Sequence, residues 1–202
     1  MAFGLHSRSE VHVRHGTTQV SRANAIRVIL DTSVGLLELA VDPDRAPAST
    51  RAFLGYVDDG SFARHGTFYR AVRKHDNDRG HPAIDVIQGG WQQPSRPLAR
   101  IEHESTRQTG LRHLDGTVSL ARGALGTATG AAFFVCIGEQ PALDAGGGRG
   151  DGEGFAAFGR VISGMDTVHL IHQRPSGAAT SDPYLQGQML ESPVRIMQAF
   201  RG

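Results

Sequence analysis

The sequence predicts a mainly β protein in which a closed, eight-stranded antiparallel barrel is capped by two α-helices. The expected strands are short, and each is bounded by Gly, Pro, Asp or Asn. Only two segments have helical spacing, one early and one late, so strands and helices do not alternate as they do in βαβ units. A chain of 202 residues is long enough for one domain with a sizeable core.

The first two strands are expected to form a hairpin over residues 28–32 and 36–41, around a short turn that contains Gly35. Leu37, Leu39 and Val41 are two residues apart from one another, which places them on one half-buried face. The remaining strands are expected over residues 67–72, 84–88, 116–121, 132–137, 158–162 and 194–200.

The first helix is expected to begin at Pro47, because proline suits the first turn of a helix. Phe53, Leu54 and Val57 form its apolar stripe, which ends at residues 58–60.

The second helix is expected over residues 165–173, where Met165, Val168 and Ile171 recur at helical spacing before Pro175. Both helices are short, so they are expected to cover the barrel rather than to form a layer of their own.

Charge and hydropathy exclude several classes of partner. The formal net charge is only +1, so the sequence lacks the basic excess that favours nucleic-acid binding. No segment approaches the roughly 18 apolar residues of a membrane span, so no membrane insertion is expected. Cys136 is the single cysteine and lies in an apolar run, which predicts a buried thiol. A closed barrel has no free strand edge, so a monomer is expected.

Residues 1–24 contain three histidines and scattered polar residues but no apolar segment of the kind found in signal peptides. We interpret them as a disordered tail or an added leader, followed by one domain over residues 25–202. Lys74 is the only lysine among 21 basic residues, a bias that favours a GC-rich bacterial coding sequence. The compartment, cytoplasm or periplasm, stays open.

Familiar catalytic and metal motifs do not account for the sequence. It contains neither a phosphate-binding glycine loop nor a GxSxG nucleophile elbow, and residues 75–81 do not fit a calcium loop. His103, Glu104 and His113 could converge on zinc, but polar loop contacts suffice to explain them. The glycine-rich residues 146–154 are interpreted as a surface loop. No metal and no cofactor are therefore expected.

Six segments carry more information together than any of them does alone. They are GTFYRAV at 66–72, VIQGG at 86–90, GTVSLAR at 116–122, AFFVCI at 132–137, LD at 143–144 and FGRVISGM at 158–165. Their order and spacing resemble the signatures of the cyclophilin-type peptidyl-prolyl cis-trans isomerases, as in a divergent bacterial member. The resemblance covers residues 26–200 and implies the same barrel with two capping helices.

The resemblance implies an isomerase that accelerates rotation about Xaa-Pro bonds during protein folding. Its partners would be proline-containing segments of unfolded or flexible proteins. By resemblance, Arg70 is the catalytic residue that donates to the prolyl nitrogen, and Gln88 either orients Arg70 or binds the substrate backbone. The same resemblance implies a substrate-binding groove formed by Tyr69, Val86, Ala121, Arg122, Phe134, Leu143 and Phe155.

Departures from the family pattern fall inside this expected groove. Tyr69 stands where the family has a His, Arg122 where it has an Asn, and Phe155 where it has a His of the pocket. Asp85 and Val86 replace a Phe-Met pair. Ala132 replaces a Gln, and Ala142 replaces an aromatic residue. Fewer donors for the peptide backbone are therefore expected, although Arg122 could compensate. The small Ala142 also predicts weak binding of the cyclic peptide inhibitor known for the family.

Two further alternatives follow from these residues. A noncatalytic proline-binding or chaperone module on the same barrel is favoured by Asp85, Ala132 and Ala142, whereas Arg70 favours the enzyme. Trp91, the only tryptophan, either stacks on the substrate or packs partly buried against the barrel.

Overall fold

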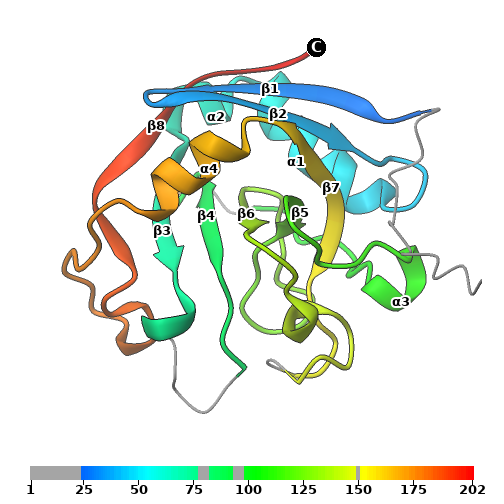
Figure 1. The fold of residues 1–202 in the computed structure, drawn as a ribbon. Coiled ribbons are helices and arrows are strands. Elements are labelled where there is room, and N and C mark those ends of the chain that lie inside the picture. The colour runs from blue at the N-terminus through cyan, green and yellow to red at the C-terminus, as the bar shows by residue number, and fades with distance from the viewer. Residues whose placement is uncertain (1–23, 77–81, 93–97, 149–150) are drawn as a thin grey trace, which may run out of the picture.

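The computed structural model describes residues 24–76, 82–92, 98–148 and 151–202. Eight antiparallel strands close into a barrel in the order β1-β2-β7-β5-β6-β4-β3-β8, which confirms the predicted fold class (Figure 1). The strands are β1 (Ile26–Thr32), β2 (Gly35–Val41), β3 (Thr67–Val72), β4 (Val86–Gly90), β5 (Thr117–Leu120), β6 (Ala132–Cys136), β7 (Ala156–Ser163) and β8 (Met189–Arg201). The expected tail at residues 1–24 lies, except for Asn24, outside the described residues.

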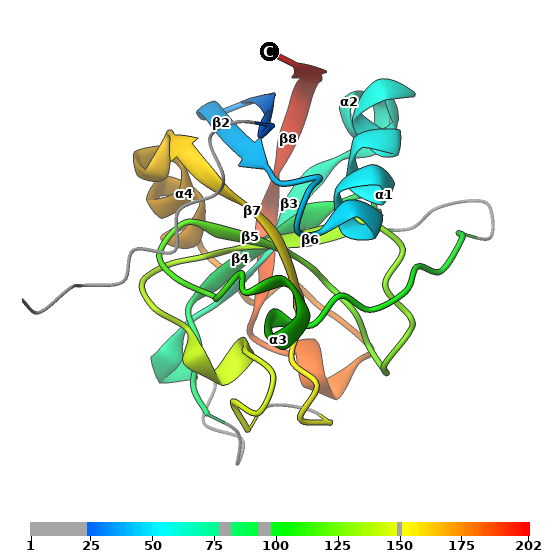
Figure 2. The same ribbon diagram turned by 90° about the vertical axis from the view of Figure 1, so that its right-hand side faces the viewer.

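The two predicted helices are α1 (Pro47–Asp58) and α4 (Met165–His172), and Figure 2 shows them on two sides of the barrel. Short helices at α2 (Ser61–His65) and α3 (Thr106–Thr109) were not predicted, because one turn gives too few residues for an apolar period. The 3-10 turns η1 (Lys74–Asp76), η2 (Pro141–Leu143) and η3 (Pro183–Leu185) were missed for the same reason.

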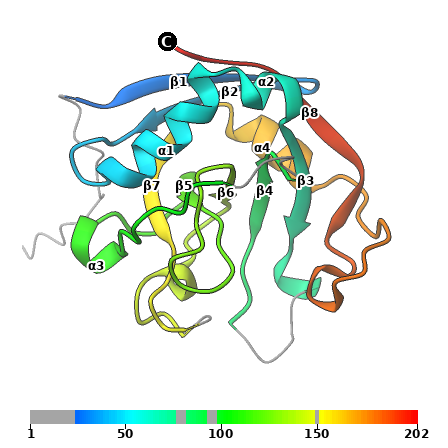
Figure 3. The ribbon, with the colours of Figure 1, turned by 180° about the vertical axis from the view of Figure 1, so that it is seen from behind.

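Strand boundaries differ from the prediction by at most two residues, except for the start of β8. β4 begins at Val86 instead of residue 84 and continues through Gly90. β8 begins at Met189, five residues before the predicted start. The pairing of β8 with β3 shifts register between Phe68 and Arg70, and beyond that shift Met189 pairs with Arg70. That early part of β8 brings the preceding segment beside β3 (Figure 3).

An apolar core fills the barrel. Phe53 of α1 packs edge-on against Phe133 of β6, with ring centroids 5.2 Å apart, and also contacts Phe62 and Phe158. Val168 and Ile171 of α4 belong to the same fully buried cluster. Because protein interiors pack as densely as organic crystals, a substrate site is expected outside this barrel rather than within it.

A second, smaller apolar cluster lies outside the barrel interior. Phe133 belongs to the barrel core, whereas its neighbour Phe134 belongs to this second cluster, as expected for successive strand residues that point to opposite faces. The members of the second cluster are Val72, Ile84, Val86, Phe134, Cys136, Ala142 and Leu143, with Ala121 and Phe155 packed against them. Cys136 is fully buried there as predicted, and burial raises the pKa of its thiol.

Within the described residues, no helix combines the length and the apolar character that crossing a membrane requires.

Candidate active site

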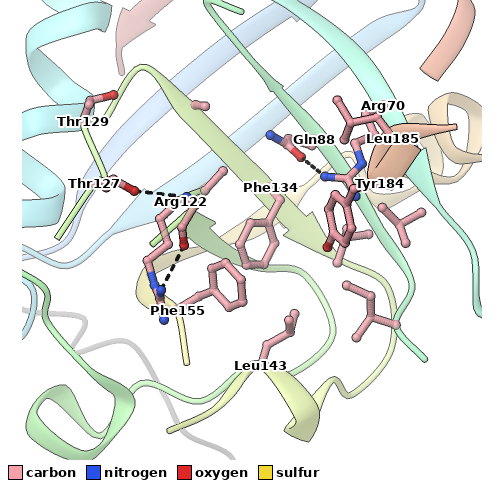
Figure 4. A pocket seen from close by; sticks show the side chains of 16 residues that line it. Arg70, Gln88, Arg122, Thr127, Thr129, Phe134, Leu143, Phe155, Tyr184 and Leu185 are labelled. Atoms are coloured by element: carbon pink, nitrogen blue, oxygen red, sulfur yellow. Dashed lines mark hydrogen bonds between the residues drawn. The ribbon is translucent and has the colours of Figure 1, made fainter. Parts of the chain in front are cut away.

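A cavity of ≈ 400 Å³ opens above the second apolar cluster (Figure 4). This volume lies within the usual range for small-ligand sites. All of the predicted site residues except Tyr69 line the cavity. They are Arg70, Gln88, Val86, Ala121, Arg122, Phe134, Leu143 and Phe155. Residues that are dispersed in the sequence therefore meet at one place.

Phe134 and Phe155 form the aromatic part of the apolar surface. Their rings meet edge to face, with centroids 5.4 Å apart, and Leu143 lies beside them. His113 stacks on Phe134 at 5.9 Å, and its Nδ1 is 2.8 Å from a carboxylate oxygen of Asp144. Because burial lowers the pKa of His113, its neutral form is favoured within the protein. The ring of Phe134 is thus packed against His113, which Asp144 holds in place.

Gln188 and Gln88 hold the guanidinium of Arg70. Its Nε and Nη2 groups donate to Gln188 Oε1 at 2.9 and 2.5 Å, and Nη1 donates to Gln88 Oε1 at 2.9 Å. Both acceptors are neutral amide oxygens, so these bonds orient the guanidinium without neutralising its charge. Of the two roles expected for Gln88, the geometry supports the orientation of Arg70.

Tyr69 lies behind Gln88 and does not line the cavity. Its hydroxyl accepts a hydrogen bond of 2.9 Å from Gln88 Nε2. The pairing of β3 with β4 shifts register between Phe68 and Arg70, so Tyr69 is the extra residue of a bulge. Burial raises the pKa of Tyr69, which keeps the hydroxyl neutral. Tyr69 thus contacts Gln88 and is not among the residues that line the cavity, and its substrate contact stays a prediction.

The two glycines after Gln88 let β4 pass close to its neighbours. A Cβ atom on Gly89 would lie 2.7 Å from the ring of Phe68, and one on Gly90 would lie 2.0 Å from the carbonyl oxygen of Ala131. Gly90 also has a φ of 117°, which side-chain-bearing residues rarely adopt. The Gln-Gly-Gly sequence thus reflects the backbone geometry that places Gln88 beside Arg70.

Arg122 uses all five of its N–H groups within the protein, which does not favour the expectation that it compensates for missing substrate donors. Nη1 and Nη2 donate to the two carboxylate oxygens of Asp151 at 2.8 and 2.7 Å. Nε and Nη2 also donate to the Gly154 carbonyl, and Nη1 to that of Gly123. The guanidinium lies 5.1 Å from the ring centroid of Phe155. Arg122 therefore fastens the segment that carries Phe155.

Hydrogen bonding to Arg122 lowers the pKa of Asp151 to about 2. Part of the glycine-rich surface loop is thus tied to the cavity wall through Asp151.

The residues of the conceivable zinc group have separate partners. The Glu104 carboxylate accepts hydrogen bonds from the backbone N–H groups of Ala48 and Ser49 at the start of α1. His103 Nε2 lies 3.1 Å from the Glu153 carbonyl, whereas His113 is bound to Asp144. The described residues contain no group of three His, Cys, Asp or Glu side chains that could hold a metal ion.

Sequence reasoning missed one whole wall of the cavity. Tyr184 and Leu185 line it from η3, and Gln188 holds Arg70 from the same segment. No motif indicated them, since Gln188 is 118 positions from Arg70. Val72 could have been identified, because it lies two residues from Arg70 on β3. The other missed lining residues are Ile84, Gly123, Thr127 and Thr129.

Trp91 is half-buried and stacks on His65, with centroids 4.6 Å apart. It is not among the residues that line the cavity, which favours the packing role over a substrate contact.

Comparisons with known proteins agree with this geometry. A sequence model of the cyclophilin type peptidyl-prolyl cis-trans isomerase/CLD family matches residues 27–199. Peptidyl-prolyl cis-trans isomerase A of Dickeya dadantii is 33% identical over 151 residues, which cover 72% of this chain and 70% of the relative. Peptidyl-prolyl cis-trans isomerase cyp18 of Streptomyces antibioticus is 31% identical over 172 residues, covering 82% and 95%.

A solved structure shows the same fold. The crystal structure of a cyclophilin type isomerase from Cryptosporidium parvum aligns with a TM-score of 0.65 at 17% identity, covering 89% of this chain and 98% of that one. The family match extends over most of the chain and includes both the barrel and the cavity residues. The chain therefore belongs to the cyclophilin-type family and is a peptidyl-prolyl cis-trans isomerase.

Proposed function

We propose that Arg70 is the catalytic residue of this isomerase and that the apolar part of the cavity binds the proline ring. One observation carries the proposal: a guanidinium oriented by two amide oxygens lies at the wall of a cavity whose other wall is aromatic. The two chemical features that Xaa-Pro rotation needs, a fixed cationic donor and an apolar proline site, are thus adjacent.

The reaction makes modest chemical demands. Resonance keeps a peptide bond planar with a rotation barrier of about 18–20 kcal/mol. At the twisted transition state this resonance is lost and the prolyl nitrogen regains its lone pair. A donor aimed at that nitrogen stabilises the twisted amide more than the planar one, which lowers the barrier. No bond forms or breaks, and no group is transferred.

The apolar residues supply the binding part of the mechanism. Phe134, Leu143 and Phe155 offer an apolar surface for the proline ring, and Val86 extends it. Holding the ring there leaves the preceding residue free to turn about the amide bond. Ala132 adds no side-chain donor for the peptide backbone, so binding is expected to rely on the apolar contact.

The proposed substrates are proline-containing segments of unfolded or flexible proteins. An Xaa-Pro bond must reach the cavity as an extended, accessible stretch, which a packed protein interior does not provide. The structure of the Cryptosporidium protein in the presence of the dipeptide Ala-Pro, at a TM-score of 0.63 to this chain, is consistent with a proline-peptide ligand for this fold.

Exchange spectroscopy tests the catalytic role. The cis-trans exchange rate of a short Ala-Pro-Phe peptide would be measured by NMR with the parent protein and with Arg70→Ala. The acceleration is expected to fall by about tenfold or more in the variant, equivalent to at least about 1.4 kcal/mol of transition-state stabilisation. Equal acceleration by the two proteins would contradict the role of Arg70.

A second outcome bears on the alternative function. Peptide chemical shifts that move without any accelerated exchange in the parent protein would favour a noncatalytic proline-binding module. Peptide titration of the same samples gives the dissociation constant, so loss of binding and loss of catalysis can be separated.

We also propose that the protein acts as a monomer. In the described part of the chain, each of the eight strands pairs with a strand on both sides, which leaves no edge for another copy to extend. Light scattering after size exclusion is expected to give the mass of one chain, and a dimer mass would contradict this proposal.

A further inference from the structure

The segment before β8 contacts the catalytic arginine from two directions. Gln188 accepts hydrogen bonds from one edge of the Arg70 guanidinium. Tyr184, four residues earlier, places its ring 5.1 Å from Arg70 Cζ. Figure 4 shows the Tyr184 ring beside the Arg70 guanidinium, on the side that faces the cavity. The segment from Tyr184 to Gln188 thus contacts both an edge and a face of the Arg70 guanidinium.

Local hydrogen bonds fix the position of Tyr184. Its backbone N–H donates to the Asp182 carboxylate at 2.9 Å, and the Leu185 N–H donates to the Asp182 carbonyl at 3.0 Å. Pro183 occupies the first position of η3, where its fixed φ suits a helical turn. The Gln188 N–H donates to the Leu185 carbonyl at 3.1 Å, which continues the ordered backbone to β8. The ring is therefore held on a structured turn.

Packing alone does not explain the aromatic side chain at this position. Tyr184 is 47% exposed, so its ring buries too little area to be an important part of the core. Its contact with Arg70 is within the distance at which a guanidinium is attracted to an aromatic face. One feature that the ring offers is the face it presents to Arg70 and to the cavity.

We propose that Tyr184 is a positioning residue for Arg70, holding the guanidinium plane in the orientation that reaches the prolyl nitrogen. This inference rests on the proposed function of Arg70. The hydrogen bonds to Gln88 and Gln188 fix the edges of the guanidinium, while the aromatic face limits its tilt toward the cavity. Tyr184 therefore acts on the rate of rotation in the bound peptide more than on peptide affinity.

Three substitutions of Tyr184 separate the contribution of its aromatic face from those of its side-chain volume and its hydroxyl. Tyr184→Phe keeps the aromatic face, Tyr184→Leu keeps apolar bulk without it, and Tyr184→Ala removes both. Exchange of the bound Ala-Pro-Phe peptide is expected to slow about fivefold in the Leu and Ala variants and to stay within about twofold of the parent in the Phe variant. The peptide dissociation constant is expected to change by less than about twofold in the Leu variant.

Phe200→Leu is the matched control. Phe200 is 44% exposed on β8 and does not line the cavity, so its replacement removes an equally exposed aromatic ring elsewhere. Its exchange rate is expected to equal that of the parent. Equal slowing in this control and in Tyr184→Leu would show a general effect of losing a surface ring and would overturn the proposal.

The NMR signal of the Arg70 Nε–H group reports on the proposed contact directly. An aromatic ring shifts nearby proton signals, so this signal is expected to move in Tyr184→Leu, to stay near its parent position in Tyr184→Phe and to be unchanged in Phe200→Leu. This order would show that the ring lies against Arg70 in solution, and slower exchange at an unchanged peptide dissociation constant would separate positioning from a merely structural role. Parent-like exchange in Tyr184→Leu would overturn the positioning role.

The two proposals can fail separately. If Arg70→Ala accelerates exchange as the parent does, the catalytic role of Arg70 fails, and the positioning role fails with it. If Arg70→Ala loses the acceleration but Tyr184→Leu keeps it, only the positioning role of Tyr184 fails.

Discussion

Arg70 and Arg122 line the same cavity but have different surroundings. Arg70 donates to the neutral amide oxygens of Gln88 and Gln188, whereas Arg122 forms a two-pronged ion pair with Asp151. Each guanidinium also lies 5.1 Å from an aromatic ring centroid, that of Tyr184 or of Phe155. Amide acceptors orient a cation and keep its charge available, while a carboxylate neutralises it. The comparison supports the proposed catalytic role of Arg70 and indicates a loop-anchoring role for Arg122.

The largest expected difference comes from making the same conservative change at both arginines. Lysine keeps the charge but lacks the planar fork that the two glutamines hold. Arg70→Lys is expected to lower kcat/KM about tenfold or more, whereas Arg122→Lys is expected to stay within about threefold of the parent. Protease-coupled assays of an Ala-Pro-Phe substrate would measure both. Equal losses at the two positions would remove the distinction between them.

A carboxylate beside Arg70 would make its surroundings similar to those of Arg122. Gln188 is buried, and its Nε2 atom has no hydrogen-bond partner among the described residues, so Gln188→Glu loses no hydrogen bond from that atom. The new charge would partly neutralise Arg70 while the oxygen acceptors remain. The exchange rate is expected to fall about fivefold, equivalent to about 1 kcal/mol.

Thermal unfolding of Gln188→Glu is the control, because a loss of activity is informative only if the variant is folded. Unchanged activity in a folded variant would mean that orientation alone matters and that the charge of Arg70 contributes little.

Breaking the ion pair of Arg122 tests the anchoring role. Asp151→Asn keeps the side-chain size but removes the charge that holds Arg122 and the segment before Phe155. Peptide binding is expected to weaken about threefold, and exchange of the bound peptide to stay near the parent rate, because an exposed ion pair contributes little free energy. Isothermal titration with the same peptide gives the dissociation constant. A loss in exchange rate without a loss in affinity would contradict anchoring.

The sequence predicted the site residues on regular strands better than the contacts that depend on a bulge or on loops. Residues on regular strands were predictable, because the alternation of side chains places Arg70, Val86 and Phe134 on defined faces. The contact of Tyr69 was not, since a one-residue bulge changes the direction of its side chain.

Contacts that depend on loops were beyond the sequence pattern. Gln188 lies 118 positions from Arg70 in a segment without periodicity, so no local pattern links the two residues. The carbonyl oxygens that saturate Arg122 belong to glycines, which carry no side chain to indicate a contact. The barrel and the apolar surface were therefore predicted more completely than the groups that orient the two arginines.

The smallest expected effect concerns pH. Hydrogen bonding to Arg122 lowers the pKa of Asp151 from 3.8 to about 2. Because the folded-state pKa lies below the unfolded one, the contribution of this ion pair is present above 3.8 and is lost as pH falls through about 2. The ratio of peptide affinities between the parent and Asp151→Asn is therefore expected to be constant from about pH 7 to about pH 3, because a carboxyl with a pKa of about 2 stays largely ionised throughout that range. A ratio that approaches unity between about pH 4 and about pH 3 would show that Asp151 titrates near its ordinary pKa. Arg122 would then be less firmly paired than the comparison with Arg70 requires.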